Sequence, residues 1–570
     1  MEEKTIIPNT LFASIKGNQN IKDAITQEIE KFLKNAKATT LLFPPDTAPN
    51  VRKFAHQIAE AHGLIHESRD SENGRELCIS KKSIQQLPAD PIISLVKTNK
   101  NSVTVNISWN SGGIYSVENL CIKTTGAAEK EIEASLSPDG SWTIPEEAKL
   151  LDYSDCHLKL QTSQETLNLT IRNLTETKQV TIEFSDLQFS TKYNLTVHTF
   201  NQNYKSEDFP FIFCTLPNAE GKLYTWGNNE DARQGIEQTK IFMTPIPHPA
   251  VESSFVEVAT NYGSNLGINT EGSLYVWGAI LNENRQEFIS LPFILEPKIS
   301  FYKIACGYRF FGAISLEGDI YTWGNGEYGE LGLGSVRFSS VPLRIESFND
   351  ERTSHRFFTD ISCSDYSYLA CNDEGLLYEW GACFNPLSGV KAMLDKPHIN
   401  KSVSSHKIAQ VSCGVGYYGV VTQEKVLLMW GENLDNQVGF DDCRILAIPR
   451  PLDIENVVQV SCGISHTGCV TADGDVWLWG KGKLGQLGGN YEDSSVPRKL
   501  EEIKGKKVSV NGKCTIVLGV DGRLYSFGEG KNGCLGIGVG GKSAKPRKVK
   551  ITNRAISVSL GIAHSIALVE

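Results

Sequence analysis

One phrase returns seven times between residues 221 and 528, and this repetition limits the possible folds more than any other feature of the sequence. A full copy reads Gly318-Asp-Ile-Tyr-Thr-Trp-Gly324. The glycines that close the copies lie 51, 46, 57, 50, 49 and 48 residues apart, and they are Gly227, Gly278, Gly324, Gly381, Gly431, Gly480 and Gly528. Such a period is the sequence signature of one supersecondary unit repeated many times.

Each copy predicts a small sheet of short strands. Alternating apolar and polar residues lead into the Trp-Gly turn, a Gly-rich loop such as Tyr328-Gly-Glu-Leu-Gly-Leu-Gly334 follows, and a further strand such as Ile304-Ala-Cys-Gly307 comes later. One such sheet cannot bury both of its faces, so the copies must pack on one another. Seven radial sheets close into a propeller. The last strand phrase, Gly561-Ile-Ala-His-Ser-Ile-Ala-Leu568, normally precedes a Trp-Gly strand, so we expect it to pair with the first copy at 221.

The ordered set of Trp-Gly, Gly-x-Leu-Gly and Cys-Gly-x-x-His resembles the regulator of chromosome condensation family of seven-bladed propellers. The resemblance covers residues 218–570, and the kelch type of propeller lacks support because its double-glycine signature is missing. Four cysteines take one equivalent position on an innermost strand in successive blades, and they are Cys306, Cys363, Cys413 and Cys462. We expect them to pack in the channel wall. The chain has no Cys-x-x-Cys pair, the common spacing of structural zinc ligands, so we expect no metal site. We expect no cofactor either.

The first 86 residues predict a small α+β domain. Apolar residues in residues 21–36 recur with helical spacing, and a second helix is expected over 51–62, with Val51 and Ala55 facing the core. Two short strands are expected at 64–68 and 75–80, and residues 1–20 are taken as an N-terminal extension.

This segment, residues 21–86, resembles the single-stranded nucleic-acid-binding domain named for its Arg-x-x-x-His signature. The signature here is Arg52-Lys-Phe-Ala-His56, preceded by Phe43-Pro-Pro. The resemblance implies single-stranded RNA or DNA as a partner, with Arg52 and His56 directed at a phosphate and Lys53 or Arg75 adding charge. The alternative is a structural role for Arg52 and His56, because residues 21–85 hold ten basic and nine acidic side chains and no row of aromatic residues.

Residues 90–216 predict a β-sandwich. Ser102-Val-Thr-Val-Asn-Ile-Ser-Trp109 alternates like a strand that buries Trp109, and Tyr193 lies in a phrase that ends in a further strand. The segment resembles a fibronectin type III domain, which implies a spacer or a contact surface without chemistry of its own. The sequence thus predicts a mainly β chain: a seven-bladed β-propeller preceded by a β-sandwich and a small α+β N-terminal domain.

Charge and hydropathy limit the partners. The chain of 570 residues has 56 basic and 66 acidic side chains, a net charge of −10, which argues against a surface that grips duplex DNA through its phosphates. No apolar run approaches the roughly 20 residues needed to cross a bilayer, and residues 1–12 do not read as a secretory signal. We therefore expect a soluble monomer without a membrane partner in the cytoplasm, with the nucleus as the alternative.

No motif of a phosphate-binding loop, a zinc protease or a serine hydrolase occurs, so no catalytic residue is expected. His466 and His564 take the repeat's own histidine position, where we expect a structural role in capping a neighbouring loop. The leading hypothesis is a non-enzymatic adaptor that joins nucleic-acid binding to a protein partner docked on a propeller face.

The family resemblance also implies an alternative, guanine-nucleotide exchange on a small Ran-like GTPase. Exchange requires only that the nucleotide-free GTPase bind better than the loaded one. The longest interval in the repeat contains the polar insertion 347–357, and the next inner turn carries an acidic residue where glycine is usual. The candidate GTPase-facing residues are Asp365, Asp350, Glu351, Arg352 and His355.

Overall fold

The computed structural model describes the C-terminal part of the chain nearly throughout and the N-terminal part element by element. The described residues are 3–6, 18–34, 38–43, 51, 53–55, 58, 65–71, 74–80, 91–99, 102–109, 119–124, 131–136, 142–143, 149–154, 157–161, 168–172, 179–185, 192–200, 209–217, 220–229, 233–237, 240–249, 251, 253–282, 285–296, 299–348, 356–384 and 391–570.

The N-terminal domain combines one long helix with a four-stranded sheet of order β1-β2-β4-β3. Its elements are β1 (Glu3–Ile6), α2 (Asn18–Lys34), β2 (Ala38–Phe43), β3 (Ile65–Ser71) and β4 (Gly74–Ser80). The expected helical stripe is confirmed, because Ile25 and Ile29 are fully buried on α2. The expected second helix is confirmed at its described residues, where Val51 and Ala55 are buried. The sequence did not reveal β1, which lies in the expected N-terminal extension and pairs in parallel with β2.

Residues 91–214 contribute eleven described strands in two sheets, of order β10-β11-β13-β6-β5 and β15-β14-β7-β12-β8-β9. They are β5 (Pro91–Asn99), β6 (Ser102–Trp109), β7 (Asn119–Thr124), β8 (Glu131–Leu136), β9 (Trp142–Thr143), β10 (Lys149–Ser154), β11 (His157–Gln161), β12 (Asn168–Arg172), β13 (Gln179–Ser185), β14 (Lys192–Phe200) and β15 (Phe209–Cys214). Strand β12 is parallel to β8 and antiparallel to β7. The fibronectin type III assignment stays a prediction, and the side chains of Trp109 and Tyr193 lie outside the described residues.

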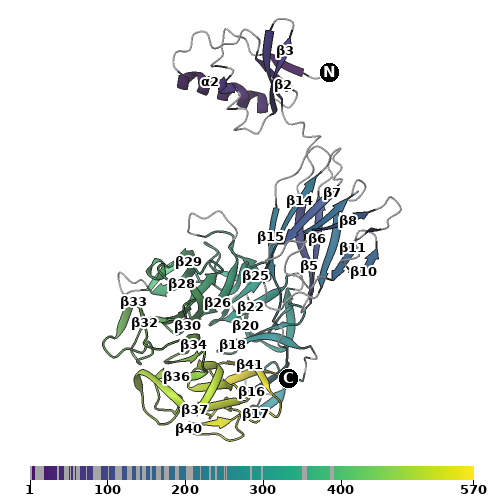
Figure 1. Ribbon diagram of the computed structural model, residues 1–570. Coiled ribbons are helices and arrows are strands. Elements are labelled where there is room, and N and C mark those ends of the chain that lie inside the picture. Colours follow the sequence, from purple (N-terminus) through teal and green to yellow (C-terminus); the bar gives the residue numbers. More distant parts are fainter. Residues whose placement is uncertain are drawn as a thin grey trace. The chain divides into compact units, whose positions relative to one another are not determined.

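The remaining strands form five four-stranded sheets and one seven-stranded sheet (Figure 1). The four-stranded sheets are β16 (Lys222–Asn228), β17 (Ile241–Pro247), β41 (Ala555–Leu560) and β42 (His564–Val569); β18 (Phe255–Asn261), β19 (Ser264–Asn269), β20 (Leu274–Asn282) and β21 (Arg285–Glu296); β22 (Phe301–Cys306), β23 (Phe310–Ser315), β24 (Ile320–Asn325) and β25 (Phe338–Arg344); β26 (Phe358–Cys363), β27 (Ser367–Asn372), β28 (Leu377–Phe384) and β29 (Lys391–Ile399); and β30 (Ile408–Cys413), β31 (Tyr417–Thr422), β32 (Leu427–Glu432) and β33 (Ile445–Pro451). A short 3-10 helix, η2 (Lys401–Val403), lies between β29 and β30.

The seven-stranded sheet contains two blades. Its strands are β34 (Val457–Cys462), β35 (His466–Thr471), β36 (Asp475–Gly480), β37 (Ser494–Asn511), β38 (Cys514–Gly519), β39 (Leu524–Glu529) and β40 (Lys542–Lys548). The long strand β37 pairs with β36 as far as Lys504 and with β38 from Gly505 onward, so it ends one blade and begins the next. The described strands therefore make the seven blades that the repeat predicts.

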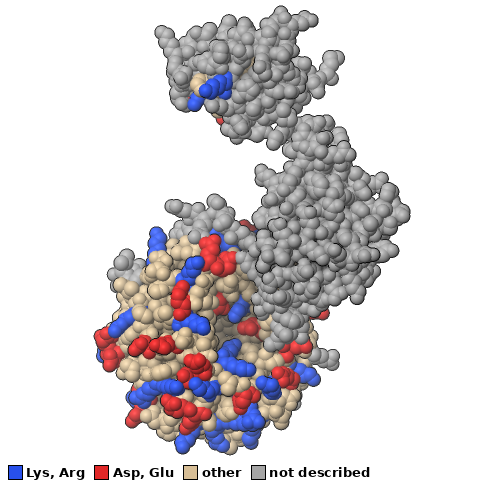
Figure 2. All heavy atoms as spheres, viewed as in Figure 1, with Lys and Arg blue, Asp and Glu red and all other residues tan. Residues whose placement is uncertain are grey.

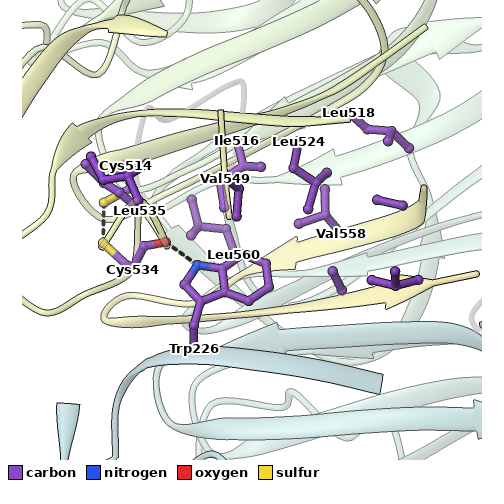
Figure 3. Close-up of a cluster of buried hydrophobic side chains, with 14 of the residues drawn as sticks. Trp226, Cys514, Ile516, Leu518, Leu524, Cys534, Leu535, Val549, Val558 and Leu560 are labelled. Atoms are coloured by element: carbon purple, nitrogen blue, oxygen red, sulfur yellow. Dashed lines mark hydrogen bonds between the residues drawn. The ribbon is translucent and has the colours of Figure 1, made fainter. Parts of the chain in front are cut away.

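The ring closes as the sequence predicts. Strand β42 runs antiparallel to β16, so the chain's last strand and its first Trp-Gly strand lie in one blade. Figure 3 shows the core at this junction, where Trp226 is buried among residues of the last blades such as Leu535 and Leu560. The indole N–H of Trp226 donates to the carbonyl of Cys534 at 2.7 Å. Closure thus buries an aromatic ring from one end of the repeat inside the other end.

The structure explains why the Trp-Gly motif needs both a tryptophan and a glycine. The six motif tryptophans are at most 2% exposed, and they are Trp226, Trp277, Trp323, Trp380, Trp430 and Trp479. The seven motif glycines have φ between 88° and 113°, a conformation that side chains rarely adopt. At Gly480 an added Cβ would also lie 2.7 Å from the carbonyl oxygen of Ser465. Glycine is therefore required by both the backbone conformation and the close approach of the preceding turn.

Candidate functional site

The nucleic-acid candidates lie on the N-terminal domain. Arg52 and His56 fall outside the described residues. Lys53 is helical and exposed, and it lies between the buried residues Val51 and Ala55. Arg75 belongs to β4, where its backbone pairs with that of Asp70 next to the β3–β4 turn. The described residues thus place Lys53 in water on a helix and Arg75 on a strand.

A channel runs through the propeller, walled by the first strand of every blade. These strands are β18, β22, β26, β30, β34, the second half of β37, and β41, and each contacts its neighbour round the ring from β18 back to β41. They enclose a cavity of about 200 Å³ that residues from all seven strands line. Basic and acidic side chains are interspersed over the propeller face seen in Figure 2.

Serine hydroxyls join neighbouring blades along this wall. In five junctions a serine on one innermost strand accepts a hydrogen bond from a backbone N–H of the next innermost strand, at 2.9–3.1 Å. The five serines are Ser362, Ser412, Ser461, Ser509 and Ser559. A hydrogen bond of this kind typically contributes about 1 kcal/mol to the free energy of unfolding. The hydroxyls that face the cavity therefore hold the ring together.

A second ring of polar side chains lies two residues earlier on the same strands. The amide of Gln459 accepts from the backbone N–H of Val508 at 2.9 Å and donates to its carbonyl at 3.1 Å. Asp360 accepts from the backbone N–H of Val411 at 3.0 Å and pairs with Lys303 at 3.3 Å. Proximity to Asp360 raises the pKa of Lys303, so the ammonium group stays charged. These polar groups also join blades, and the sequence analysis did not identify them.

The cysteines lie where the sequence placed them. Cys306, Cys363, Cys413 and Cys462 end successive innermost strands and line the cavity. The thiol of Cys413 donates to the carbonyl of Ser362 at 3.3 Å, and burial raises the pKa of Cys462 to about 12. Protonated thiols of this kind are poor metal ligands and poor nucleophiles. Among the described residues no three His, Cys, Asp or Glu side chains gather as a metal site would require.

His466 and His564 are buried between blades. The Nε2–H of His466 donates to the hydroxyl of Thr515 at 2.9 Å, because that hydroxyl in turn donates to the carbonyl of Gln486. Burial lowers the pKa of His466 to about 4, so the ring is neutral. The Nε2 of His564 likewise lies 2.8 Å from the hydroxyl of Thr260. Both imidazoles contact strands of the next blade rather than the loop that the sequence analysis expected.

Asp365 lies at one mouth of the channel, in the turn between β26 and β27. Its carboxylate accepts a hydrogen bond of 2.7 Å from the hydroxyl of Tyr262, which comes from the β18–β19 turn two blades away. Burial and this bond to Asp365 raise the pKa of Tyr262, so the phenol stays protonated. The other sequence-predicted candidates, Asp350, Glu351, Arg352 and His355, lie outside the described residues.

Four tyrosines are linked to Asp365, either directly or through one another, and none of them was expected from the sequence. Tyr262 packs on Tyr308 with ring centroids 4.6 Å apart, and Tyr328 meets Tyr366 edge to face at 5.3 Å. We name Tyr262, Tyr308, Tyr328, Tyr366 and Asp365 together the tyrosine rim. The sequence contains a signal for this cluster. The turns that follow β18, β22 and β26 each contain a tyrosine, whereas the turns that follow β30 and β34 contain Gly414-Val415 and Gly463-Ile464 and no tyrosine.

Tyr262 has an unfavourable backbone conformation. Its φ is 39°, whereas the corresponding two-residue turn between β37 and β38 has Gly512 at φ 51°. Positive φ costs a residue with a Cβ about 1–2 kcal/mol. Strain of this kind is often retained where a side chain serves a function. Here the side chain reaches across the channel mouth to Asp365.

Comparison with known proteins identifies two regions. Residues 282–567 match the RCC1-like domain, and residues 21–81 match the R-3-H domain, a nucleic-acid-binding domain. The ultraviolet-B receptor UVR8 of Arabidopsis thaliana is 30% identical over 253 residues, which are 43% of this chain and 56% of the receptor. The chain thus spans about half the length of this curated relative.

Two solved structures share the propeller fold. Human WBSCR16 aligns with a TM-score of 0.55 and 19% identity, covering 61% of this chain and 100% of that one. Prp20p from Saccharomyces cerevisiae, described with its binding properties to Gsp1p and histones, aligns with a TM-score of 0.55 and 19% identity over 62% of this chain and 92% of its own. Among the described helices none has the length and apolar character needed to cross a membrane.

Proposed function

Because this chain belongs to the RCC1-like domain family and also carries an R-3-H domain, we propose that it is a non-enzymatic adaptor. Its N-terminal domain, residues 21–86, binds single-stranded nucleic acid, and its propeller, residues 218–570, docks a protein partner. Residues 90–216 act as a fibronectin-like spacer, and residues 1–20 precede the binding domain. The observation that supports the proposal most is the presence of both domain matches in one chain.

The chemistry of the described propeller residues supports docking rather than turnover. On the innermost strands, the side chains of Ser362, Cys413 and Gln459 are engaged in hydrogen bonds between blades. His466 and His564 are both fully buried, and His466 is also neutral. Neither histidine is therefore positioned as a base open to a substrate. A rigid ring of blades with a broad rim suits recognition of another macromolecule.

The proposed nucleic-acid contacts are Arg52, Lys53, His56 and Arg75. Arg52 and His56 are spaced as i and i+4, so on a helix they share a face next to the buried pair Val51 and Ala55. A guanidinium and an imidazole N–H on one face can both donate to a phosphate. Lys53 is exposed and adds charge beside them.

The test is a fluorescence-anisotropy titration of the full chain with labelled single-stranded RNA and DNA at several salt concentrations. We expect binding that weakens as salt rises, because each phosphate contact releases counterions. The double variant Arg52→Ala, His56→Ala should bind about tenfold or more weakly, since two charge-assisted contacts are lost. A matched control is Lys31→Ala on α2, whose side chain is 70% exposed and which should bind like the wild type. Wild-type affinity in the double variant would contradict the assignment.

A second candidate function is nucleotide exchange on a small GTPase, and the observation that favours it is the carboxylate of Asp365 held at the channel mouth. Asp365, with Asp350, Glu351, Arg352 and His355, would face the GTPase and compete for its phosphate-binding lysine. The test measures release of a fluorescent GDP analogue from a Ran-like GTPase. Exchange by the wild type that Asp365→Ala abolishes would support this function, and no acceleration by the wild type would refute it.

A further inference from the structure

The tyrosine rim presents aromatic surface and a carboxylate at one place on the propeller. Tyr328 and Tyr366 are 44% and 38% exposed, and their rings contact each other. Asp365 lies beside them, and the exposed Glu327 precedes Tyr328 in the same loop. The rim thus combines aromatic faces with negative charge.

One cation of the chain itself already lies against the rim. The guanidinium of Arg309 lies over the ring of Tyr308, with its central carbon 4.9 Å from the ring centroid. Arg309 is exposed and has a positive φ of 70°, so it reaches this position from a strained turn. Cations are attracted to the faces of aromatic rings, and a neighbouring carboxylate attracts them as well through its negative charge.

From these contacts we propose that the tyrosine rim binds a Lys or Arg side chain from a basic segment of the docked partner protein. The cation would lie against Tyr328 and Tyr366 and face the carboxylate of Asp365. Hydrogen bonding by Tyr262 fixes that carboxylate at the channel mouth. With Arg309 counted, two carboxylates (Asp365 and Glu327) stand against one guanidinium here, and this balance favours a basic peptide over the phosphate backbone of RNA. The inference rests on the proposed docking function and gives the partner its chemistry.

The experiment titrates the full chain into a fluorescein-labelled dodecapeptide of alternating Gly and Arg. The comparison peptide has citrulline, which is neutral, in place of every Arg. We expect the Arg peptide to bind about tenfold more tightly. Tyr366→Leu and Tyr328→Leu should each weaken its binding about threefold to tenfold, the range that a lost cation–π contact implies. Asp365→Asn should weaken it similarly.

Three controls make the result specific. Tyr366→Phe keeps the ring and should bind within about twofold of the wild type. Tyr491→Leu removes another exposed tyrosine, 51% exposed, and should leave the affinity unchanged. The double variant Arg52→Ala, His56→Ala should bind the peptide normally, so failure of the nucleic-acid assignment and failure of this site are distinguishable.

Two outcomes would overturn the proposal. If Tyr366→Leu and Asp365→Asn bind the Arg peptide as the wild type does, the peptide is attracted only by the net charge of −10. If Tyr366→Leu instead weakens labelled single-stranded RNA and spares the peptide, the rim is a base-stacking site.

Discussion

Replacing Glu330 by glutamine should stabilise the propeller above neutral pH and leave it nearly unchanged in acid. Glu330 is 1% exposed, and its Oε2 accepts the backbone N–H of Tyr328 at 2.7 Å. Other blades have glutamine at this position, where Gln437 and Gln486 accept the corresponding backbone N–H at 2.8 and 3.0 Å. Glu330 thus has a carboxylate at a buried position that a neutral amide occupies in these other blades.

The sign of the effect follows from the pKa. Burial raises the pKa of Glu330 from 4.5 to about 7. Well below pH 4.5 the group is protonated in both the folded and the unfolded chain. As pH rises toward 7 the unfolded chain gives up this proton first, so the folded state loses stability. A pKa difference of this size corresponds to about 3 kcal/mol, and relaxation of the protein around the buried charge lowers the expected loss to about 2 kcal/mol above about pH 7.

The assay is urea unfolding of the full chain, followed by tryptophan fluorescence, at about pH 5 and about pH 8. Glu330→Gln should exceed the wild type by about 2 kcal/mol at about pH 8 and by much less at about pH 5. The opposite substitution, Gln486→Glu, should make an equally pH-dependent loss. Glu379, whose pKa burial also raises to about 7, is common to all variants and cancels in the difference. A gain from Glu330→Gln that is the same at both pH values would refute the reasoning.

Two further predictions concern the junction that closes the ring. Trp226→Ala should lower the free energy of unfolding by about 3–5 kcal/mol in the same assay. Trp477→Ala, at a half-buried tryptophan, should lower it clearly less. Equal decreases in the two variants would contradict the assigned core. The Sγ atoms of Cys514 and Cys534 lie 2.6 Å apart, so treatment with diamide should join them in a disulfide, which peptide mapping without reductant detects and Cys534→Ser abolishes. A modified but unlinked pair would count against this geometry.

The repeat made the propeller predictable because its main determinants are local. A Trp-Gly turn, a Gly-rich loop and a strand phrase recur within about fifty residues, and each requires a particular side-chain size or backbone conformation. Ring closure was also predictable, since the last strand phrase lacked its Trp-Gly strand and the first Trp-Gly strand lacked its predecessor. The pairing of β42 with β16 confirms that reasoning.

The site was less predictable because it depends on contacts between distant turns. Tyr262 and Asp365 are 103 residues apart and meet only because the ring brings their turns to one mouth. In the sequence, Gln459 is an ordinary strand residue. Only the ring brings its amide into hydrogen bonds with the backbone of the next blade. In the N-terminal domain, β1 was missed because a four-residue strand leaves too short a pattern to recognise.

The adaptor function itself can be tested by asking whether the chain bridges its two partners. Beads carrying the Gly-Arg dodecapeptide are mixed with labelled single-stranded RNA, with and without the full chain, and the retained RNA is measured. We expect the wild type to retain RNA. The double variant Arg52→Ala, His56→Ala should release the RNA while the protein stays bound, and Tyr366→Leu should reduce retention of both RNA and protein. Undiminished RNA retention by both variants would contradict the claim that the two ends of the chain bind separate partners.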